Sequence, residues 1–253
     1  MTRAKNTGAV YTSEFFAGQA DGSARSAAIV VPLVLSLLPV RSVIDVGCGV
    51  GTWAAAFATN GVPDVWGVDG DYLDRSQLRI SPDRYWARDL MEPLLFDRTF
   101  DLAVCLEVAE HLPESRASSL VADLTSMASC VLFSAAVPGP TGTNHINSQF
   151  LPYWVELFEK RGFEAIDPVR PRIWGNEAVE WFYQQDIVMF APPGHELLTK
   201  HFPKPQSLLH QELYEQVLHQ KPTLGAIVRG FPEAVSRSIR YRLGLPLQNR
   251  RNG

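Results

Sequence analysis

The sequence contains little cysteine, with only three thiols among 253 residues. Cys48, Cys105 and Cys130 all fall in or beside apolar runs, and their spacing matches no thiolate metal site. This placement predicts buried, reduced thiols and argues against a disulfide framework. We therefore expect a cytoplasmic protein.

The sequence also lacks an excess of basic residues and a long hydrophobic run. The 23 lysines and arginines stand against 27 acidic residues, so the net charge is −4, which weighs against a nucleic-acid partner. The longest apolar stretch, Ala27 to Val40, contains Pro32, Ser36 and Pro39 and is too short to span a bilayer. Met1 to Ser13 lacks the apolar centre of a signal peptide. We expect no stable membrane insertion.

Short β-rich runs alternate with helical patterns along most of the chain. With 46% apolar residues to fill a core, this alternation predicts an α/β fold built on a mainly parallel sheet. The expected strands are Ser42–Val46, Asp64–Val68, Tyr85–Ala87, Asp101–Leu106, Cys130–Ser134, Phe163–Ile166 and Asp186–Phe190. The expected helices are Ala24–Leu38, Thr52–Asn60, Glu114–Ser126, Gln149–Arg161 and Glu177–Gln184.

The chain after Pro192-Pro193-Gly194 is less regular. It looks helical in pieces up to His219, and residues 221–253 carry six arginines against one glutamate. We interpret this region as an extension that forms a homodimer or covers the domain, with contact to a membrane surface or a polyanion as the alternative. The predicted organisation is an N-terminal lid and first helix at residues 1–40, a ligand-binding domain at 41–193, and a helical C-terminal extension at 194–253.

A glycine-rich turn follows the first expected strand. The segment Asp45-Val46-Gly47-Cys48-Gly49-Val50-Gly51 leads from a buried strand into a helix, and its glycines permit positive φ and close approach of a ligand. Asp69 follows about 20 residues later, where a carboxylate can accept hydrogen bonds from both ribose hydroxyls of a nucleoside. The turn is too compact for a dinucleotide fingerprint and no lysine follows it, so a ligand without phosphate is favoured.

These motifs resemble those of class I S-adenosylmethionine-dependent methyltransferases. Besides the glycine turn, Gly67-Val68-Asp69-Gly70, Arg88-Asp89-Leu90 and the segment from Phe100-Asp101-Leu102 to His111 are similar to motifs of that family, in the same order. The resemblance implies a Rossmann-like fold, with a seven-stranded, mostly parallel sheet and helices on both faces. It implies that Asp45 lies near the methionine amino group and Gly47, Gly49 and Gly51 beneath the nucleoside. It further implies that Asp69, beside Gly70, binds the ribose, and that Asp89 and the N–H of Leu90 bind the adenine.

Tyr11, Phe15 and Phe16 precede the first expected helix. They would form a lid over the cofactor or a hydrophobic staple.

Two carboxylates and two imidazoles follow neighbouring strands. Glu107, Glu110 and His111 come directly after the apolar run that ends at Leu106, and His145 lies in the long loop after the next strand. Because parallel strands end at the same edge, we expect these side chains to converge beside the cofactor. Such ligands suit a divalent ion, Mg²⁺ or Mn²⁺, which prefers about six ligands and would leave positions for two substrate hydroxyls. The alternative is that Glu110 and His111 only shape the loop.

Some of the same side chains are also the candidate catalytic groups. The metal would lower the pKa of the acceptor hydroxyl and orient its oxygen, with Glu107, His111 and His145 in catalytic positions. If no metal binds, His145 or His111 becomes the candidate general base. The four-ligand pattern also resembles the small-RNA 2′-O-methyltransferases, so methylation of an RNA terminus is a second hypothesis. A cofactor-binding scaffold without catalysis is a third.

The wider pattern resembles a group of bacterial sugar O-methyltransferases. The segments that carry this resemblance are Glu107 to Pro113, Ser134 to Pro138, His145 to Gln149 and Arg172-Ile173-Trp174. Within the group, the methylmannose polysaccharide 1-O-methyltransferases are the most similar, which implies methylation of the reducing-end 1-hydroxyl of a 3-O-methylated mannoside. Tyr153 and Trp174 are the candidate acceptor contacts. An O-methyltransferase of another glycosylated natural product would show a similar pattern.

Overall fold

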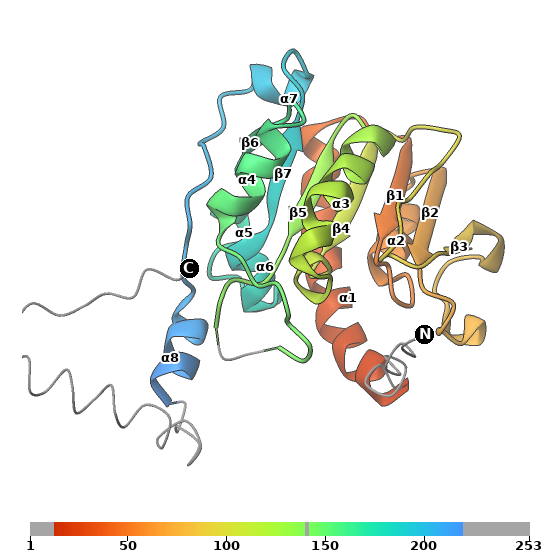
Figure 1. The fold of residues 1–253 in the computed structure, drawn as a ribbon, viewed down its shortest axis with the longest axis horizontal. Coiled ribbons are helices and arrows are strands. Elements are labelled where there is room, and N and C mark those ends of the chain that lie inside the picture. The colour runs from red at the N-terminus through yellow and green to blue at the C-terminus, as the bar shows by residue number, and fades with distance from the viewer. Residues whose placement is uncertain (1–12, 140–141, 220–253) are drawn as a thin grey trace, which may run out of the picture. The chain divides into compact units, whose positions relative to one another are not determined.

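The computed structural model describes residues 13–139 and 142–219 (Figure 1). Tyr11 of the predicted lid and the arginine-rich residues 221–253 lie outside the described residues, as do the side chains of Phe15 and Phe16.

Seven strands form one sheet in the order β3-β2-β1-β4-β5-β7-β6 (Figure 1). Strands β1 to β5 pair in parallel, while β7 pairs antiparallel with both β5 and β6. The predicted Rossmann-like, mostly parallel sheet is therefore confirmed, with small shifts at the strand ends. The strands are β1 (Ser42–Val46), β2 (Asp64–Asp69), β3 (Tyr85–Ala87), β4 (Leu102–Leu106), β5 (Val131–Ser134), β6 (Glu164–Ile166) and β7 (Val188–Ala191).

Helices cover both faces of the sheet. The α-helices are α1 (Ser13–Leu37), α2 (Thr52–Thr59), α3 (Glu114–Met127), α4 (Leu151–Glu159), α5 (Arg170–Ile173), α6 (Trp181–Asp186), α7 (Glu196–Thr199) and α8 (Gln211–His219). The described residues also include the short 3-10 helices η2 (Arg75–Gln77), η3 (Pro82–Arg84) and η4 (Ala109–His111).

The core has two layers because successive strand residues point to opposite faces. Val43 and Leu132 join the apolar cluster formed with α1 and α2, whereas Ile44 and Phe133 join the cluster formed with α3 and α4. Both faces of the central strands are buried, as expected for parallel strands covered by helices. Cys48, Cys105 and Cys130 are buried and unpaired, as predicted.

Helix α1 begins well before the position predicted from sequence. Asp21-Gly22-Ser23 disfavours a helix by propensity, yet it lies inside α1. The Glu180 side chain packs so closely on Gly22 that a Cβ at that position would overlap it, and the Ser26 hydroxyl donates to the Gly22 carbonyl (2.8 Å). Arg25 also forms an ion pair with Glu180 (2.8 Å). Contacts distant in sequence therefore override the local preference.

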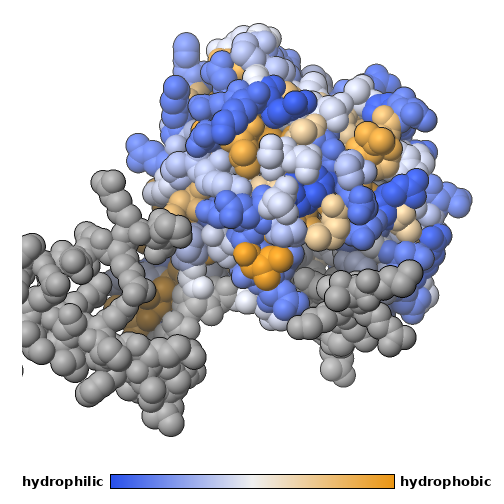
Figure 2. All heavy atoms as spheres, viewed as in Figure 1, coloured by the Kyte–Doolittle hydropathy of each residue, from blue (hydrophilic) through white to orange (hydrophobic). Residues whose placement is uncertain are grey.

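The chain divides after Tyr214 into two compact units. Within the first unit, Leu197 of α7 is buried in the core, and the N–H of His210 donates to Oε1 of Gln185 (2.7 Å). The predicted boundaries at residues 40 and 193 remain predictions. In the part of the chain that the structure describes, no helix combines the length and apolar character needed to cross a bilayer. Figure 2 shows hydrophobic residues as separate spots among hydrophilic ones on the face in view.

Candidate active site

The glycine-rich loop lies between β1 and α2. Gly47, Gly49 and Gly51 have φ angles of 76°, 52° and 81°, which glycine adopts without strain. The N–H of Gly47 donates to the carbonyl of Val68 (2.8 Å), and a Cβ at Gly47 would overlap the Val108 side chain. The loop is thus held between the ends of β2 and β4.

Two buried carboxylates flank this loop. Asp45 accepts a hydrogen bond from the N–H of Ala54 (3.1 Å). Burial raises the pKa of Asp45 to about 7; the Ala54 bond opposes this shift and the nearby Asp69 adds to it. Burial also raises the pKa of Asp69, whose Oδ2 accepts from the N–H of Gly49 (2.8 Å). Asp69 therefore ties the loop to the end of β2, where the ribose of a nucleoside was predicted.

The turn after β3 carries the predicted adenine contacts. The N–H of Arg88 donates to the carbonyl of Asp69 (2.8 Å), which brings this turn to the end of β2. The exposed Asp89 accepts from the N–H of Met91 (2.9 Å), and the carbonyl of Leu90 accepts from Nε of Arg116 (2.9 Å). The adenine-binding role of Asp89 and Leu90 remains a prediction.

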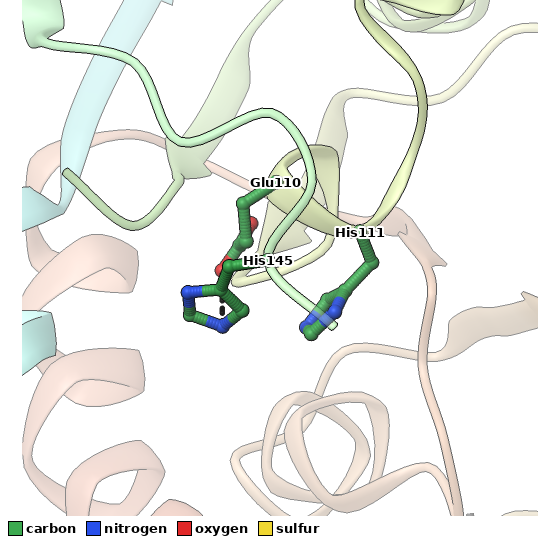
Figure 3. A group of neighbouring side chains, drawn as sticks. All are labelled: Glu110, His111 and His145. Carbon is green, nitrogen blue, oxygen red and sulfur yellow. Dashed lines mark ion pairs between the residues drawn. The ribbon is translucent and has the colours of Figure 1, made fainter. Parts of the chain in front are cut away.

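Three of the four predicted metal ligands converge at the edge of the sheet (Figure 3). Glu110 and His111 lie in η4 after β4, and His145 comes from the loop after β5. One ligand atom from each lies within 4.8 Å of the others. Nε2 of His145 is 4.0 Å from Oε1 of Glu110, and the two imidazole rings are 4.8 Å apart.

Backbone contacts hold the two loops together. The carbonyl of Glu110 accepts from the N–H groups of Ile146 (2.9 Å) and Asn147 (3.0 Å), which fixes the chain directly after His145 to η4. The His145 ring lies against Gly142, whose φ is 107°, and a Cβ at Gly142 would overlap the ring. The position of His145 is thus determined by the backbone around it.

The cluster is electrostatically unusual. Glu110 is fully buried, and neither of its carboxylate oxygens has a hydrogen-bond partner among the described residues. Burial and then the neighbouring Glu107 raise the pKa of Glu110 well above its ordinary value. Burial and then His145 lower the pKa of His111 to about 4, and burial lowers the pKa of His145. Both imidazoles are therefore neutral at neutral pH, the form that donates a lone pair to a metal.

Glu107 lies beside this cluster but is not part of the group of three. Its φ is 56°, a strained conformation for a residue with a side chain, and its N–H is 3.1 Å from both the carbonyl oxygen and Oγ of Ser134. Its Oε1 is buried without a hydrogen-bond partner among the described residues, and burial raises its pKa to about 7. Its role as a metal ligand stays a prediction.

Sequence reasoning missed Asp186, a partly buried carboxylate near Glu107. Burial and then the Glu107 charge raise the pKa of Asp186 well above its ordinary value. Asp186 lines a small hollow with Trp154, Arg170 and Gln185, and Nε1 of Trp154 is buried without a partner among the described residues. No local motif marks Asp186. It directly precedes β7 and reaches the site because β7 pairs with β5.

The ring contacts that the structure gives for the two predicted acceptor residues are with residues other than the metal-ligand cluster. Tyr153 is half-buried on α4 and packs edge-on against Trp154 (5.1 Å between centroids). Trp174 is 45% exposed and its ring lies 5.2 Å from that of His210. Their contact with a substrate stays a prediction.

The comparisons with known proteins agree with this geometry. A family described as a methyltransferase domain matches residues 19–131, which include the glycine loop and η4. This segment, somewhat less than half of the chain, is therefore similar to methyltransferase domains. A search of curated protein sequences finds no significant match.

Solved methyltransferases share the fold of this domain. A sugar N-methyltransferase from a Streptoalloteichus species superimposes with a TM-score of 0.55 at 14% identity, over 76% of this chain and 98% of that one. An amino pentose methyltransferase from Micromonospora echinaspora, involved in calicheamicin biosynthesis and solved with bound S-adenosylmethionine, gives 0.52 at 16% identity, over 71% and 96%. An O-methyltransferase family protein from Burkholderia thailandensis gives 0.53 at 12% identity, over 71% of this chain but only 57% of its own length. These likenesses establish the Rossmann-like methyltransferase fold.

Proposed function

We propose that the enzyme is a divalent-metal-assisted O-methyltransferase that methylates a sugar hydroxyl. The observation that carries the proposal is the cluster of Glu110, His111 and His145 at the strand edge next to the glycine loop. A methyl donor bound by that loop and a hydroxyl bound near the cluster would share the space between them, as methyl transfer requires.

The donor set fits a metal ion such as Mg²⁺ or Mn²⁺. Buried carboxylate oxygens without partners are costly unless a cation accompanies them, and Glu110 has two. Neutral His111 and His145 add nitrogen ligands, for which the borderline ion Mn²⁺ is better suited than Mg²⁺. When bound, the ion would supply Lewis acidity that makes an acceptor hydroxyl more acidic.

The side chains perform the remaining steps. Asp45 and Asp69 would hold the amino group and the ribose of S-adenosylmethionine, so that its methyl group faces the cluster. The hydroxyl oxygen then attacks the methyl carbon in line with the departing sulfur, the C–S bond breaks, and the hydroxyl proton must leave. Glu107 has the pKa suited to accept that proton, about 7, and a buried oxygen without a partner. His111 and His145 are the candidate bases if no metal is required.

A saccharide acceptor is supported by the motif resemblance and by two structural neighbours that act on sugars. The finer proposal is the reducing-end 1-hydroxyl of a 3-O-methylated mannoside, with Tyr153 and Trp174 as contacts. The alternatives are an RNA terminal 2′-hydroxyl and another glycosylated natural product. The net charge of −4 favours a sugar over RNA, because phosphate-driven binding needs a basic surface.

A screen of sugar and RNA acceptors with labelled S-adenosylmethionine, run with Mg²⁺, Mn²⁺ or EDTA, tests the proposal. We expect methylation of a mannoside with free 1- and 2-hydroxyls, loss of turnover in EDTA, and little change between low and high salt. His145→Ala should lose most turnover while calorimetry shows unchanged cofactor affinity. Full activity in EDTA would refute the catalytic metal, and transfer only to RNA, with a steep fall in high salt, would refute the sugar acceptor.

A further inference from the structure

The predicted ribose-binding carboxylate already accepts a hydrogen bond from a side chain. Oδ1 of Asp69 accepts from the N–H of Gly70 (2.7 Å) and from the hydroxyl of Tyr72 (2.5 Å), while Oδ2 accepts from the N–H of Gly49 (2.8 Å). Two of these donors are backbone groups that fix the glycine loop and the end of β2. The third belongs to a side chain that is 49% exposed.

The local backbone explains why the tyrosine reaches this position. The Cδ1–Cε1 edge of the Tyr72 ring lies so close to Gly70 that a Cβ at Gly70 would overlap it. The neighbouring Leu73 is buried, and the Tyr85 hydroxyl donates to the Gly70 carbonyl (2.6 Å), so the turn itself is anchored. Because Tyr72 is already 49% exposed, rotating its side chain into solvent uncovers only the remaining half of its surface.

The hydrogen-bonding capacity of Asp69 makes Tyr72 a competitor for a ribose. An ionised carboxylate offers about four acceptor positions, two on each oxygen. Gly70 and Tyr72 use both positions on Oδ1, and Gly49 uses one on Oδ2. A ribose that donates two hydroxyls therefore needs one more position than remains. The backbone donors cannot leave without opening the glycine loop, whereas the Tyr72 hydroxyl can leave by side-chain rotation.

We propose that Tyr72 is a displaceable internal ligand of Asp69, which gives way to the ribose of the bound nucleoside and so weakens the affinity for cofactor and product alike. This inference rests on the proposed binding of ribose by Asp69. Tyr72 would thereby set the affinity of the site for the nucleoside, and would keep the enzyme from binding the demethylated product too tightly.

Calorimetry on the full chain tests the proposal with three ligands: S-adenosylhomocysteine, adenosine and 2′,3′-dideoxyadenosine. In Tyr72→Phe, S-adenosylhomocysteine and adenosine should bind about fivefold to tenfold more tightly. The reason is that the variant lacks the competing hydrogen bond to a charged group at a partly exposed position. Dideoxyadenosine lacks the 2′- and 3′-hydroxyls that would bind Asp69, so its affinity should not rise. Unchanged or weaker adenosine binding overturns the proposal, as does an equal gain for adenosine and dideoxyadenosine.

Two further variants separate this proposal from the assignment of Asp69. Tyr85→Phe also removes a hydroxyl from the same turn, but one bonded to Gly70, and should give no gain that depends on the ribose hydroxyls. Asp69→Asn should weaken adenosine binding. Wild-type affinity in Asp69→Asn would refute the ribose assignment and the proposal with it. Weakened binding in Asp69→Asn, with no gain in Tyr72→Phe, would refute only the role of Tyr72.

Discussion

Asp45 is a buried acid whose charge the fold tolerates at a cost to stability. It is 3% exposed, and its ordinary pKa of 3.8 rises to about 7 in the folded protein, chiefly through burial. A carboxyl whose folded pKa is raised stabilises the fold while protonated, and this contribution is lost as the pH rises through the folded pKa. Asp45→Asn removes the titration and leaves an amide oxygen to accept from the N–H of Ala54.

The expected gain in stability depends on pH in a way that the two pKa values determine. Above pH 7, the shift of about three units corresponds to about 4 kcal/mol of destabilisation by ionised Asp45, at about 1.4 kcal/mol per unit. At pH 5 the folded carboxyl is protonated, and only the difference of about one unit between the pH and the unfolded pKa counts, or about 1 to 2 kcal/mol. Asp45→Asn should therefore stabilise the protein about 2 to 3 kcal/mol more at pH 8 than at pH 5.

Urea unfolding of the wild type and Asp45→Asn at pH 5, 6.5 and 8 measures this difference. Other titrating groups cancel in the comparison at each pH, provided that the dependence on urea stays the same in both proteins. Asp74→Asn is the matched control, because Asp74 is exposed and the N–H of Ser76 lowers its pKa, so no gain should develop as the pH rises. If the difference between Asp45→Asn and wild type is the same at pH 5 and pH 8, the reasoning fails.

Further outcomes follow from the same site. Asp45→Asn should lose most affinity for S-adenosylmethionine, since its carboxylate would no longer face the ligand's amino group; calorimetry at pH 8 measures this loss. Gly142→Ala should reduce turnover nearly as far as His145→Ala, about a hundredfold or more if the ring loses its position, with S-adenosylmethionine binding retained. Glu110→Gln should raise the unfolding midpoint at neutral pH, because burial raises the pKa of Glu110 and folding must either bury its charge or take up a proton, yet abolish Mn²⁺ binding measured by electron paramagnetic resonance. A lower midpoint, or retained Mn²⁺ binding, would contradict the last prediction.

Much of the fold is predictable because parallel, doubly covered strands have a strong local signature. Runs such as Leu102–Leu106 are apolar on both faces and end at glycine, acidic or loop residues, so their positions are predicted well. Asp45, Asp69 and the Glu110-His111 pair were found for a related reason, since each stands at the carboxyl end of a strand. The early start of α1 was not predictable, because it depends on Glu180 packing against Gly22.

The parts of the site that sequence reasoning missed depend on pairings across the sheet. Asp186 has no motif around it, and it joins the site because β7 runs antiparallel beside β5, with Phe133 opposite Val188. Tyr72 carries no signal either, since its contact with Asp69 depends on the conformation of the turn at Gly70. Side chains brought together by non-local pairing or by a single turn geometry cannot be read from spacing.

Some buried acids elsewhere in the chain form ion pairs with arginine, and the carboxylates at the strand edge differ from them. Buried Asp123 forms an ion pair with Arg116, and buried Asp167 forms one with Arg170. Among the described residues, neither Asp45 nor Glu110 has a lysine or arginine within ion-pair distance, although both are at least as well buried. A chain that pairs Asp123 and Asp167 with arginine, yet leaves Asp45 and Glu110 with raised pKa values, keeps sites for cations that it does not itself supply. The ammonium group of S-adenosylmethionine at Asp45 and a divalent ion at Glu110 are the cations that the proposed reaction would bring there.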